Sequence, residues 1–95
     1  MKLKTIESST NKNKKMKAIF ILDNEKTKTV HFGFKGSQTY LDHKDDKKKQ
    51  AYLARHKVNE NWNDPTTPGS LAKNILWNKS TLSASIIDFK KRFNL

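Results

Sequence analysis

Hydrophobic and polar residues alternate along the first third of the chain, as they do in half-buried strands. Residues 16–22 are rich in β-branched and aromatic side chains and carry apolar residues on both faces, which predicts the central strand of a sheet. Residues 27–32 alternate well enough to be its hairpin partner. Gly33 and Gly36 then permit a sharp turn out of the sheet. A β-hairpin over residues 16–36 follows from this pattern.

The first fifteen residues allow two interpretations. Residues 2–6 are short and extended in character, with lysines that would protect a sheet edge from further pairing. A polar, turn-forming stretch follows at residues 8–13. Residues 1–15 are therefore predicted to form an edge strand, and the alternative is a disordered basic arm.

The segment from Asp42 to Trp62 is the longest one without Gly or Pro that has a helical period. Asp42 or Asp45 is a suitable N-cap for this helix. Its predicted apolar face consists of Ala51, Ala54, Val58 and Trp62. Arg55 falls inside that face, where a buried guanidinium needs a carboxylate partner or an anion. Two hypotheses remain open for Arg55. It forms an internal ion pair with Asp64 or Asp88, or it shares an anion site with His31 or His43.

Two further helices are predicted in the C-terminal third. Thr67 is placed to cap the first of them, with Pro68 in its first turn. Its buried face is predicted to consist of Leu71, Ala72, Ile75 and Leu76. Ser80 or Thr81 caps the last helix. The clearest amphipathic stripe in the chain belongs to this helix and consists of Leu82, Ile86, Phe89 and Phe93.

These elements predict an α+β fold in which a small antiparallel sheet of two to three N-terminal strands packs against three C-terminal helices. A sheet with one apolar face and helices with one apolar stripe each bury those surfaces by packing together. Ninety-five residues suffice for a single domain spanning 1–95, with its helical part at 42–95.

Charge changes the picture more than any motif does. Lys and Arg number 20 against nine Asp and Glu, which gives a formal charge of +11, and 18 of the 20 are Lys. A surplus of this size attracts polyanions, chiefly nucleic acid. The bias toward Lys argues against reading of base edges, for which Arg is the commoner residue. The alternative is that the lysines serve solubility alone.

Several classes of function are disfavoured by composition. The chain has no Cys, which excludes disulfides, thiolate zinc sites and cysteine nucleophiles. No apolar run approaches the roughly 20 residues of a membrane span, and residues 1–6 lack the apolar stretch of a signal peptide. No cofactor and no membrane contact are therefore predicted.

Histidines and aromatic residues are the remaining candidates for chemistry. His31, His43 and His56, with the acids near His43, suggest a metal-dependent nuclease, although two ligands on one helix commonly occur by chance. The aromatic side chains that are candidates for stacking on unpaired bases are Tyr40, Tyr52, Trp62 and Trp77. The alternative for all of them is a structural role in the core or at the surface.

Several short motifs together resemble a small uncharacterised domain family of large double-stranded DNA viruses. They are Thr29-Val30-His31-Phe32-Gly33, His43-Lys44-Asp45, Arg55-His56 and Ile75-Leu76-Trp77-Asn78-Lys79. The resemblance covers roughly residues 8–93 and departs at Ser80 and Pro68, where the family pattern has Pro and a small residue. It implies a viral protein that is made in the infected cell and is located in the host-cell cytoplasm or nucleus, or is packaged in the virion.

The leading hypothesis is a non-enzymatic module that binds nucleic acid, DNA above all, with little sequence specificity. The residues predicted to contact phosphates are Lys12, Lys14, Lys15, Lys17, Lys47, Lys48, Lys49, Arg55, Lys90, Lys91 and Arg92. The alternatives are a structural virion protein that contacts an acidic protein partner, and the metal-dependent nuclease.

Overall fold

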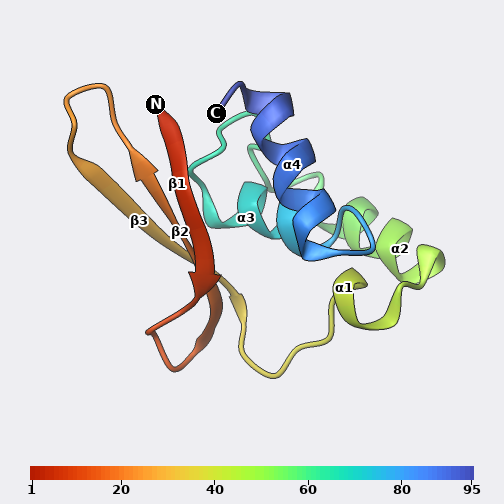
Figure 1. The fold of residues 1–95 in the computed structure, drawn as a ribbon. Helices are drawn as coiled ribbons and strands as arrows, with labels where there is room; N and C mark the ends of the chain where they lie inside the picture. The colour runs from red at the N-terminus through yellow and green to blue at the C-terminus, as the bar shows by residue number, and fades with distance from the viewer.

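A computed structural model describes residues 1–95 and shows a three-stranded antiparallel sheet (Figure 1). The strands are β1 (Lys2–Ser8), β2 (Lys14–Ile21) and β3 (Thr27–Phe34), in the order β1-β2-β3. The central position of β2 and the hairpin with β3 are confirmed. The N-terminal segment is a strand and not a free basic arm, because β1 pairs with β2 along its length.

The register gives the sheet one apolar face. Leu3 lies opposite Phe20, and Ala18 lies opposite Val30, with all four side chains buried. The other face carries Lys17 opposite His31 and Ile19 opposite Thr29. The pairing shifts by one residue between Leu3 and Thr5, so that β1 keeps both its apolar and its polar positions in phase with β2.

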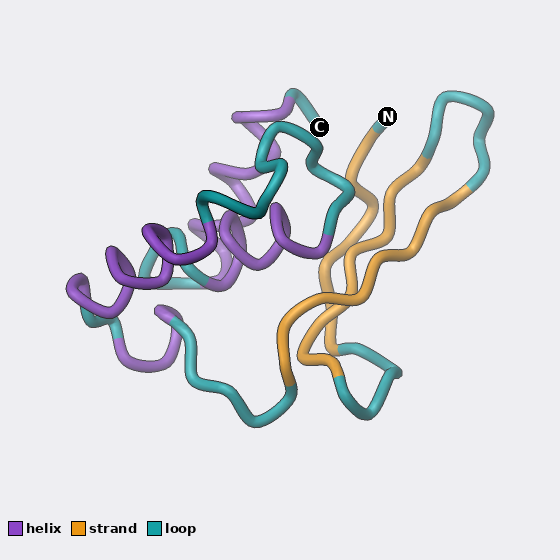
Figure 2. Tube along the Cα trace, turned by 180° about the vertical axis from the view of Figure 1, so that it is seen from behind, coloured by secondary structure: helices purple, strands orange, loops and turns teal.

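All helices lie on the apolar side of the sheet, which makes two layers (Figure 2). They are α1 (Tyr40–His43), α2 (Asp46–His56), α3 (Pro68–Leu71) and α4 (Leu82–Phe93). A π-helical turn, η1 (Ala72–Leu76), continues α3 without a break. The predicted α+β fold, with an N-terminal sheet against C-terminal helices, is confirmed.

The helix starts follow the predicted capping chemistry. The Asp45 carboxylate accepts hydrogen bonds from the backbone N–H groups of Lys47 at 2.9 Å and Lys48 at 3.2 Å. The hydroxyls of Thr67 and Thr81 cap α3 and α4 in the same way, at 3.1 Å and 3.2 Å from the N–H groups they bind. Of the caps proposed for the first long helix, Asp45 is the correct one, and Asp42 instead accepts from the Thr39 backbone at 2.7 Å.

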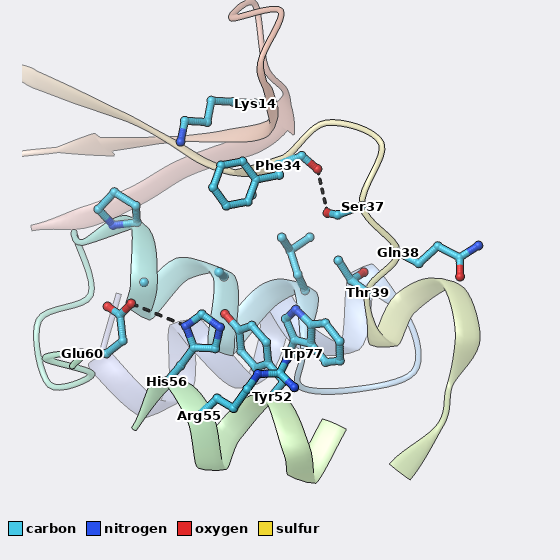
Figure 3. A pocket seen from close by; sticks show the side chains of 15 residues that line it. Lys14, Phe34, Ser37, Gln38, Thr39, Tyr52, Arg55, His56, Glu60 and Trp77 are labelled. Carbon is cyan, nitrogen blue, oxygen red and sulfur yellow. Dashed lines mark hydrogen bonds and ion pairs between the residues drawn. The ribbon is translucent and has the colours of Figure 1, made fainter. Parts of the chain in front are cut away.

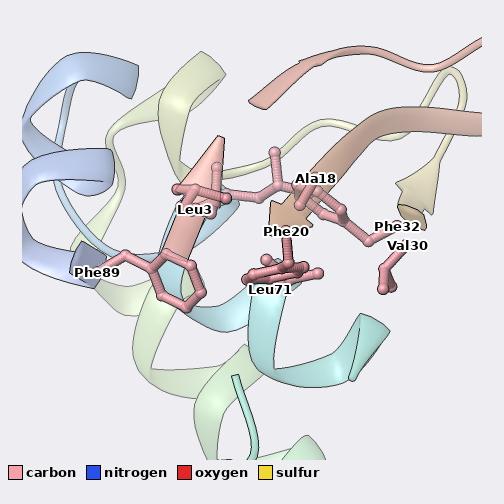
Figure 4. Close-up of a cluster of buried hydrophobic side chains, with 9 residues drawn as sticks. Leu3, Ala18, Phe20, Val30, Phe32, Leu71 and Phe89 are labelled. Carbon is pink, nitrogen blue, oxygen red and sulfur yellow. The ribbon is translucent and has the colours of Figure 1, made fainter. Parts of the chain in front are cut away.

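Nine apolar residues form the core between the two layers (Figure 4). Phe20 and Phe32 from the sheet, and Phe89 from α4, are completely buried. The helical side of the core also includes Leu71, Ile75 and Leu76, as predicted. The stripe on α4 packs as expected, with Leu82, Ile86 and Phe93 half-buried against the core.

The prediction for the segment from Asp42 to Trp62 was wrong in two respects. The segment is not one helix to Trp62, because α1 ends at Lys44, whose φ of 52° is left-handed, and α2, which starts after its Asp45 cap, already ends at His56. The expected apolar face is also not buried, because Ala51 and Ala54 are exposed and the Val58 side chain is 78% exposed. Short alanine side chains at a helical period do not supply enough apolar area to bring a helix into the core.

A different set of contacts anchors α2. Tyr52 stacks on Trp77 with ring centroids 4.3 Å apart. The Lys49 Nζ donates a hydrogen bond to the backbone carbonyl of Asn78 at 2.6 Å. Because no residue of α2 is fully buried, this helix lies beside the core and not within it.

Substitutions of Gly33 and Gly36 test how tightly η1 packs against the end of β3. Both have positive φ, of 78° and 88°, but only at Gly33 would a Cβ atom meet neighbours, the Leu76 Cδ1 at 2.9 Å and the Lys15 Cβ at 3.0 Å. We expect Gly36→Ala to lower the free energy of unfolding by about 1 kcal/mol through backbone strain alone, and Gly33→Ala by about 2–4 kcal/mol. Urea unfolding of both variants measures the difference. Equal losses would show that the close approach of η1 to β3 is not tight.

Candidate functional site

A cleft of about 380 Å³ lies between the end of the sheet and the helices (Figure 3). Phe34 and Lys14, from the paired ends of β3 and β2, line one wall. Tyr52, Arg55 and His56 of α2 line the opposite wall. Its remaining walls are formed by α3, η1 and the loop after β3. Residues of both the N-terminal sheet and the C-terminal helices therefore line the cleft.

An aromatic stack forms the wall on the side of α2. The Tyr52 ring lies parallel to Trp77, with an interplanar angle of 4°, and His56 stacks on Tyr52 at 4.2 Å. Tyr52 and His56 are one helical turn apart, which places both rings on one face of α2. His43 packs against Trp77 at 5.3 Å and extends the stack.

Of the four aromatic residues predicted to form a stacking surface, the structure brings only Tyr52 and Trp77 together. Tyr40 donates its hydroxyl to Asp46 at 2.8 Å outside the cleft. Trp62 lies under the Lys73 Nζ at 4.9 Å. Partial burial lowers the pKa of Lys73.

Phe34 is the most exposed aromatic ring that lines the cleft, with 72% of its surface accessible. The Lys14 Nζ lies 5.0 Å from the centroid of this ring, in a cation–π contact across the β2–β3 pair. Sequence reasoning missed Phe34 as a site residue. The available signal was an apolar residue between two glycines, at a strand end where no core residue is needed.

Glu60 is the only carboxylate that lines the cleft. Its Oε1 lies 3.9 Å from the Nδ1 of His56. The rest of the carboxylate lies against Gly69, where a Cβ atom would collide with it. A glycine at this position therefore makes room for the acid at one end of the cleft.

Arg55 does not occupy the buried position that the sequence predicts. It is exposed and forms no ion pair within 4 Å with Asp64 or Asp88. Asp64 instead accepts from Thr66, and Asp88 accepts from Asn78 and Arg92. The helical period predicts that the face of α2 that carries Arg55 packs against the core. In the structure Arg55 lines the cleft and is exposed to solvent.

A second hollow of about 210 Å³ adjoins the cleft at Arg55 and is lined also by His43 and Lys48. Arg55 thus lies between two hollows, and its guanidinium has no carboxylate partner. Arg55 and His43 line the same hollow, and their sharing of an anion stays a prediction. His31 lines neither hollow and bonds to Ser9 on the sheet at 2.6 Å.

The residues predicted to contact phosphates do not form one group. Lys14 and Arg55 line the cleft, and Lys48 lines the adjoining hollow. Lys49 is used structurally, since its Nζ binds the Asn78 carbonyl and lies 4.7 Å from the Tyr40 ring.

The remaining predicted lysines and arginine lie away from the cleft. Lys12 is exposed in the β1–β2 turn, and Lys47 is exposed on the first turn of α2. Lys15 lies in β2, and Lys17 of the same strand pairs with Glu7 at 3.4 Å. The last turn of α4 carries the exposed Lys90, Lys91 and Arg92. Positive charge therefore surrounds much of the molecule, and only part of it faces the cleft.

The three histidines do not converge. His31 lies on the sheet, His43 accepts a hydrogen bond from the Asp45 backbone at 3.0 Å, and His56 faces Glu60. No group of three or more His, Asp or Glu side chains is arranged to hold a metal ion.

Residues 4–56 match a family of unknown function, DUF5754. The chain belongs to this family. The match begins within β1 and extends through β2, β3, α1 and α2. It therefore includes Lys14, Phe34, Tyr52 and Arg55 of the cleft, while Trp77 lies beyond it. No curated protein and no solved structure matches the chain. No helix of the structure has the length and apolar character that crossing a membrane requires.

Tyr52 gives a pH-dependent test of the aromatic wall. Burial, assisted by the negative charge of Glu60, raises the pKa of Tyr52 from its usual value to about 12. The folded protein then keeps the phenolic proton at a pH where the unfolded chain has lost it. The contribution of this group to the free energy of unfolding therefore falls as pH rises from about 10 to about 12.

We expect the Tyr52→Phe variant to lack this contribution. Urea unfolding between pH 10 and 12 should show that the stability of the natural protein falls by about 1–2 kcal/mol more than that of Tyr52→Phe, after allowance for partial solvent screening. Lysine titration affects both proteins equally and cancels in the comparison. Parallel pH profiles would contradict the buried position of the phenol.

Proposed function

We propose that this protein is a non-enzymatic module that binds nucleic acid with little sequence specificity. The observation that supports the proposal is that very few Lys and Arg side chains form ion pairs with the carboxylates of the protein. Of the 20 Lys and Arg side chains, only Lys17 and Arg92 lie within 4 Å of a carboxylate. The formal charge of +11 is therefore displayed to solvent largely unpaired.

The carboxylates stay away from the lysines because most have other partners. Asp45 caps α2, and Asp64 accepts from the Thr66 backbone and hydroxyl. Hydrogen bonds from Thr66 lower the pKa of Asp64, and a bond from the Asn78 amide lowers that of Asp88. Asp42 is held in the same way by the Thr39 backbone. Acids that are used for local structure leave the cations free for an external anion.

Phosphate backbones are the polyanions that such a surface suits best. Lysine is a point charge that contacts a phosphate without selecting a base, which favours binding independent of sequence. The distribution of cations over β2, α2 and α4 supports contacts along an extended ligand. An acidic protein partner would use the same charges, but would not need an exposed aromatic ring in a cationic cleft.

The proposal includes a biological setting. The resemblance of the sequence motifs to a domain family of large double-stranded DNA viruses supports a viral protein that acts on DNA in the infected cell or within the virion. Co-purification with virion components after nuclease treatment would instead favour the structural role with an acidic protein partner.

Salt dependence tests the electrostatic part of the proposal. If about six phosphates are contacted, the affinity for a DNA duplex falls about a thousandfold between 50 and 200 mM salt. Fluorescence anisotropy with two labelled duplexes of unrelated sequence measures this, and both duplexes should bind with similar affinity. Absence of binding at 50 mM salt, or binding that salt does not weaken, would refute the proposal.

The same samples test for catalysis. DNA incubated with the protein and Mg²⁺ should remain intact in gel electrophoresis. Cleavage that disappears in the His43→Ala or His56→Ala variant would show a metal-dependent nuclease instead.

A further inference from the structure

The cleft has features that duplex binding through phosphates does not require. A basic surface alone is enough to hold a phosphate backbone. Here two cations without carboxylate partners, an exposed phenyl ring and the Tyr52 phenol line a partly open cleft of about 380 Å³. This volume lies within the range of sites for small organic ligands. The combination calls for a ligand that is planar, aromatic and anionic.

We infer that this cleft binds one unstacked nucleotide of a single-stranded nucleic acid, with its base on Phe34 and its phosphate between Lys14 and Arg55. The inference rests on the proposed function and assigns a preference for single strands to it. A paired base in a duplex does not expose its face, and therefore cannot stack on a protein ring without being unpaired first.

Phe34 is placed to receive a base. With 72% of its surface accessible, the ring is not part of the core, and the contact that it makes with Lys14 is itself cationic. Aromatic side chains beside lysines are the usual means of binding single strands without sequence preference, because every base has a π-face. An exposed phenyl ring that had no ligand would instead leave apolar surface in water.

The charges agree with a phosphate as the second part of the ligand. Lys14 comes from the sheet and Arg55 from α2, on opposite walls of the cleft (Figure 3). Neither side chain has a carboxylate within 4 Å. Both side chains line the cleft, so an anionic ligand bound there is attracted by two positive charges that no carboxylate of the protein neutralises.

The Tyr52 hydroxyl is a further hydrogen-bond donor in the cleft. The Tyr52 hydroxyl lies on the cleft side of the aromatic stack (Figure 3), and among the hydrogen bonds of the protein none involves it. A phenol is protonated at neutral pH, so that this hydroxyl can donate a hydrogen bond to a ligand. Glu60, the only acid in the cleft, opposes an anionic ligand.

The experiment compares an oligothymidylate of about 20 nucleotides with a DNA duplex of equal length. We expect Phe34→Ala to weaken binding of the single strand about 10-fold and to leave duplex binding unchanged. Val58→Ala is the matched control, because Val58 is 78% exposed and lies outside the cleft. Since both side chains are largely exposed, both variants should fold.

A second pair of variants separates the phosphate site from overall charge. Arg55→Gln and Lys57→Gln each remove one positive charge from neighbouring positions, but only Arg55 lines the cleft. We expect Arg55→Gln to weaken binding of the single strand several-fold more than Lys57→Gln does. Glu60→Gln should strengthen this binding, an effect that a merely damaged fold cannot produce.

Trp77 provides a direct signal from the cleft. In a Trp62→Phe variant it is the only tryptophan, and the single strand should quench its fluorescence in a saturable manner. Equal effects of Phe34→Ala and Val58→Ala, together with equal effects of the two charge variants, would overturn the inference. Salt-dependent duplex binding would then still support the proposed function. If neither DNA binds, the proposed function and the inference both fail.

Discussion

Packing of the single apolar face of the sheet against α3 and η1 is the interaction on which the rest of the structure depends. Phe20 and Phe32 are completely buried there, against helical residues such as Leu71 and Ile75. Hydrophobic residues make up only 34% of the chain, and nine of them form this single buried core. The opposite face of the sheet and the whole of α2 remain outside the core for this reason.

The cleft follows from this small apolar content of the chain. The open end of the β2–β3 pair, at Lys14 and Phe34, lines one side of the cleft, and α2 lines the other. Tyr52 performs two roles at this point, because its ring anchors α2 to Trp77 while its hydroxyl side lines the cleft. Two close approaches shape the walls, η1 against Gly33 and Glu60 against Gly69, and both need a residue without a Cβ atom.

Acidic and basic side chains have different roles in this structure. Several carboxylates accept hydrogen bonds from backbone N–H groups in helix caps and turns, as Asp45 and Asp64 do. Lysines are then left to solvent, apart from a few with structural partners such as Lys49. A protein built in this way keeps a small core and a large unpaired charge at the same time, which is a suitable combination for contact with a polyanion.

The sequence by itself determined the elements whose signals are local. Alternation predicted the β2–β3 hairpin, hydroxyl and carboxylate caps predicted the starts of α2, α3 and α4, and the apolar stripe of α4 was read correctly. These features depend on φ and ψ preferences and on neighbours within one turn, so they are legible without the fold.

Only the tertiary structure decided which helical face was covered and which residues formed a site. Arg55 was expected in a buried face and is exposed, because a helical period shows where apolar side chains lie but not whether a partner surface exists to bury them. The stack of Tyr52 on Trp77, and the cleft that Lys14, Phe34 and Arg55 line, bring together segments far apart in the chain. Such pairings depend on how the layers dock, and no local pattern in the sequence encodes that.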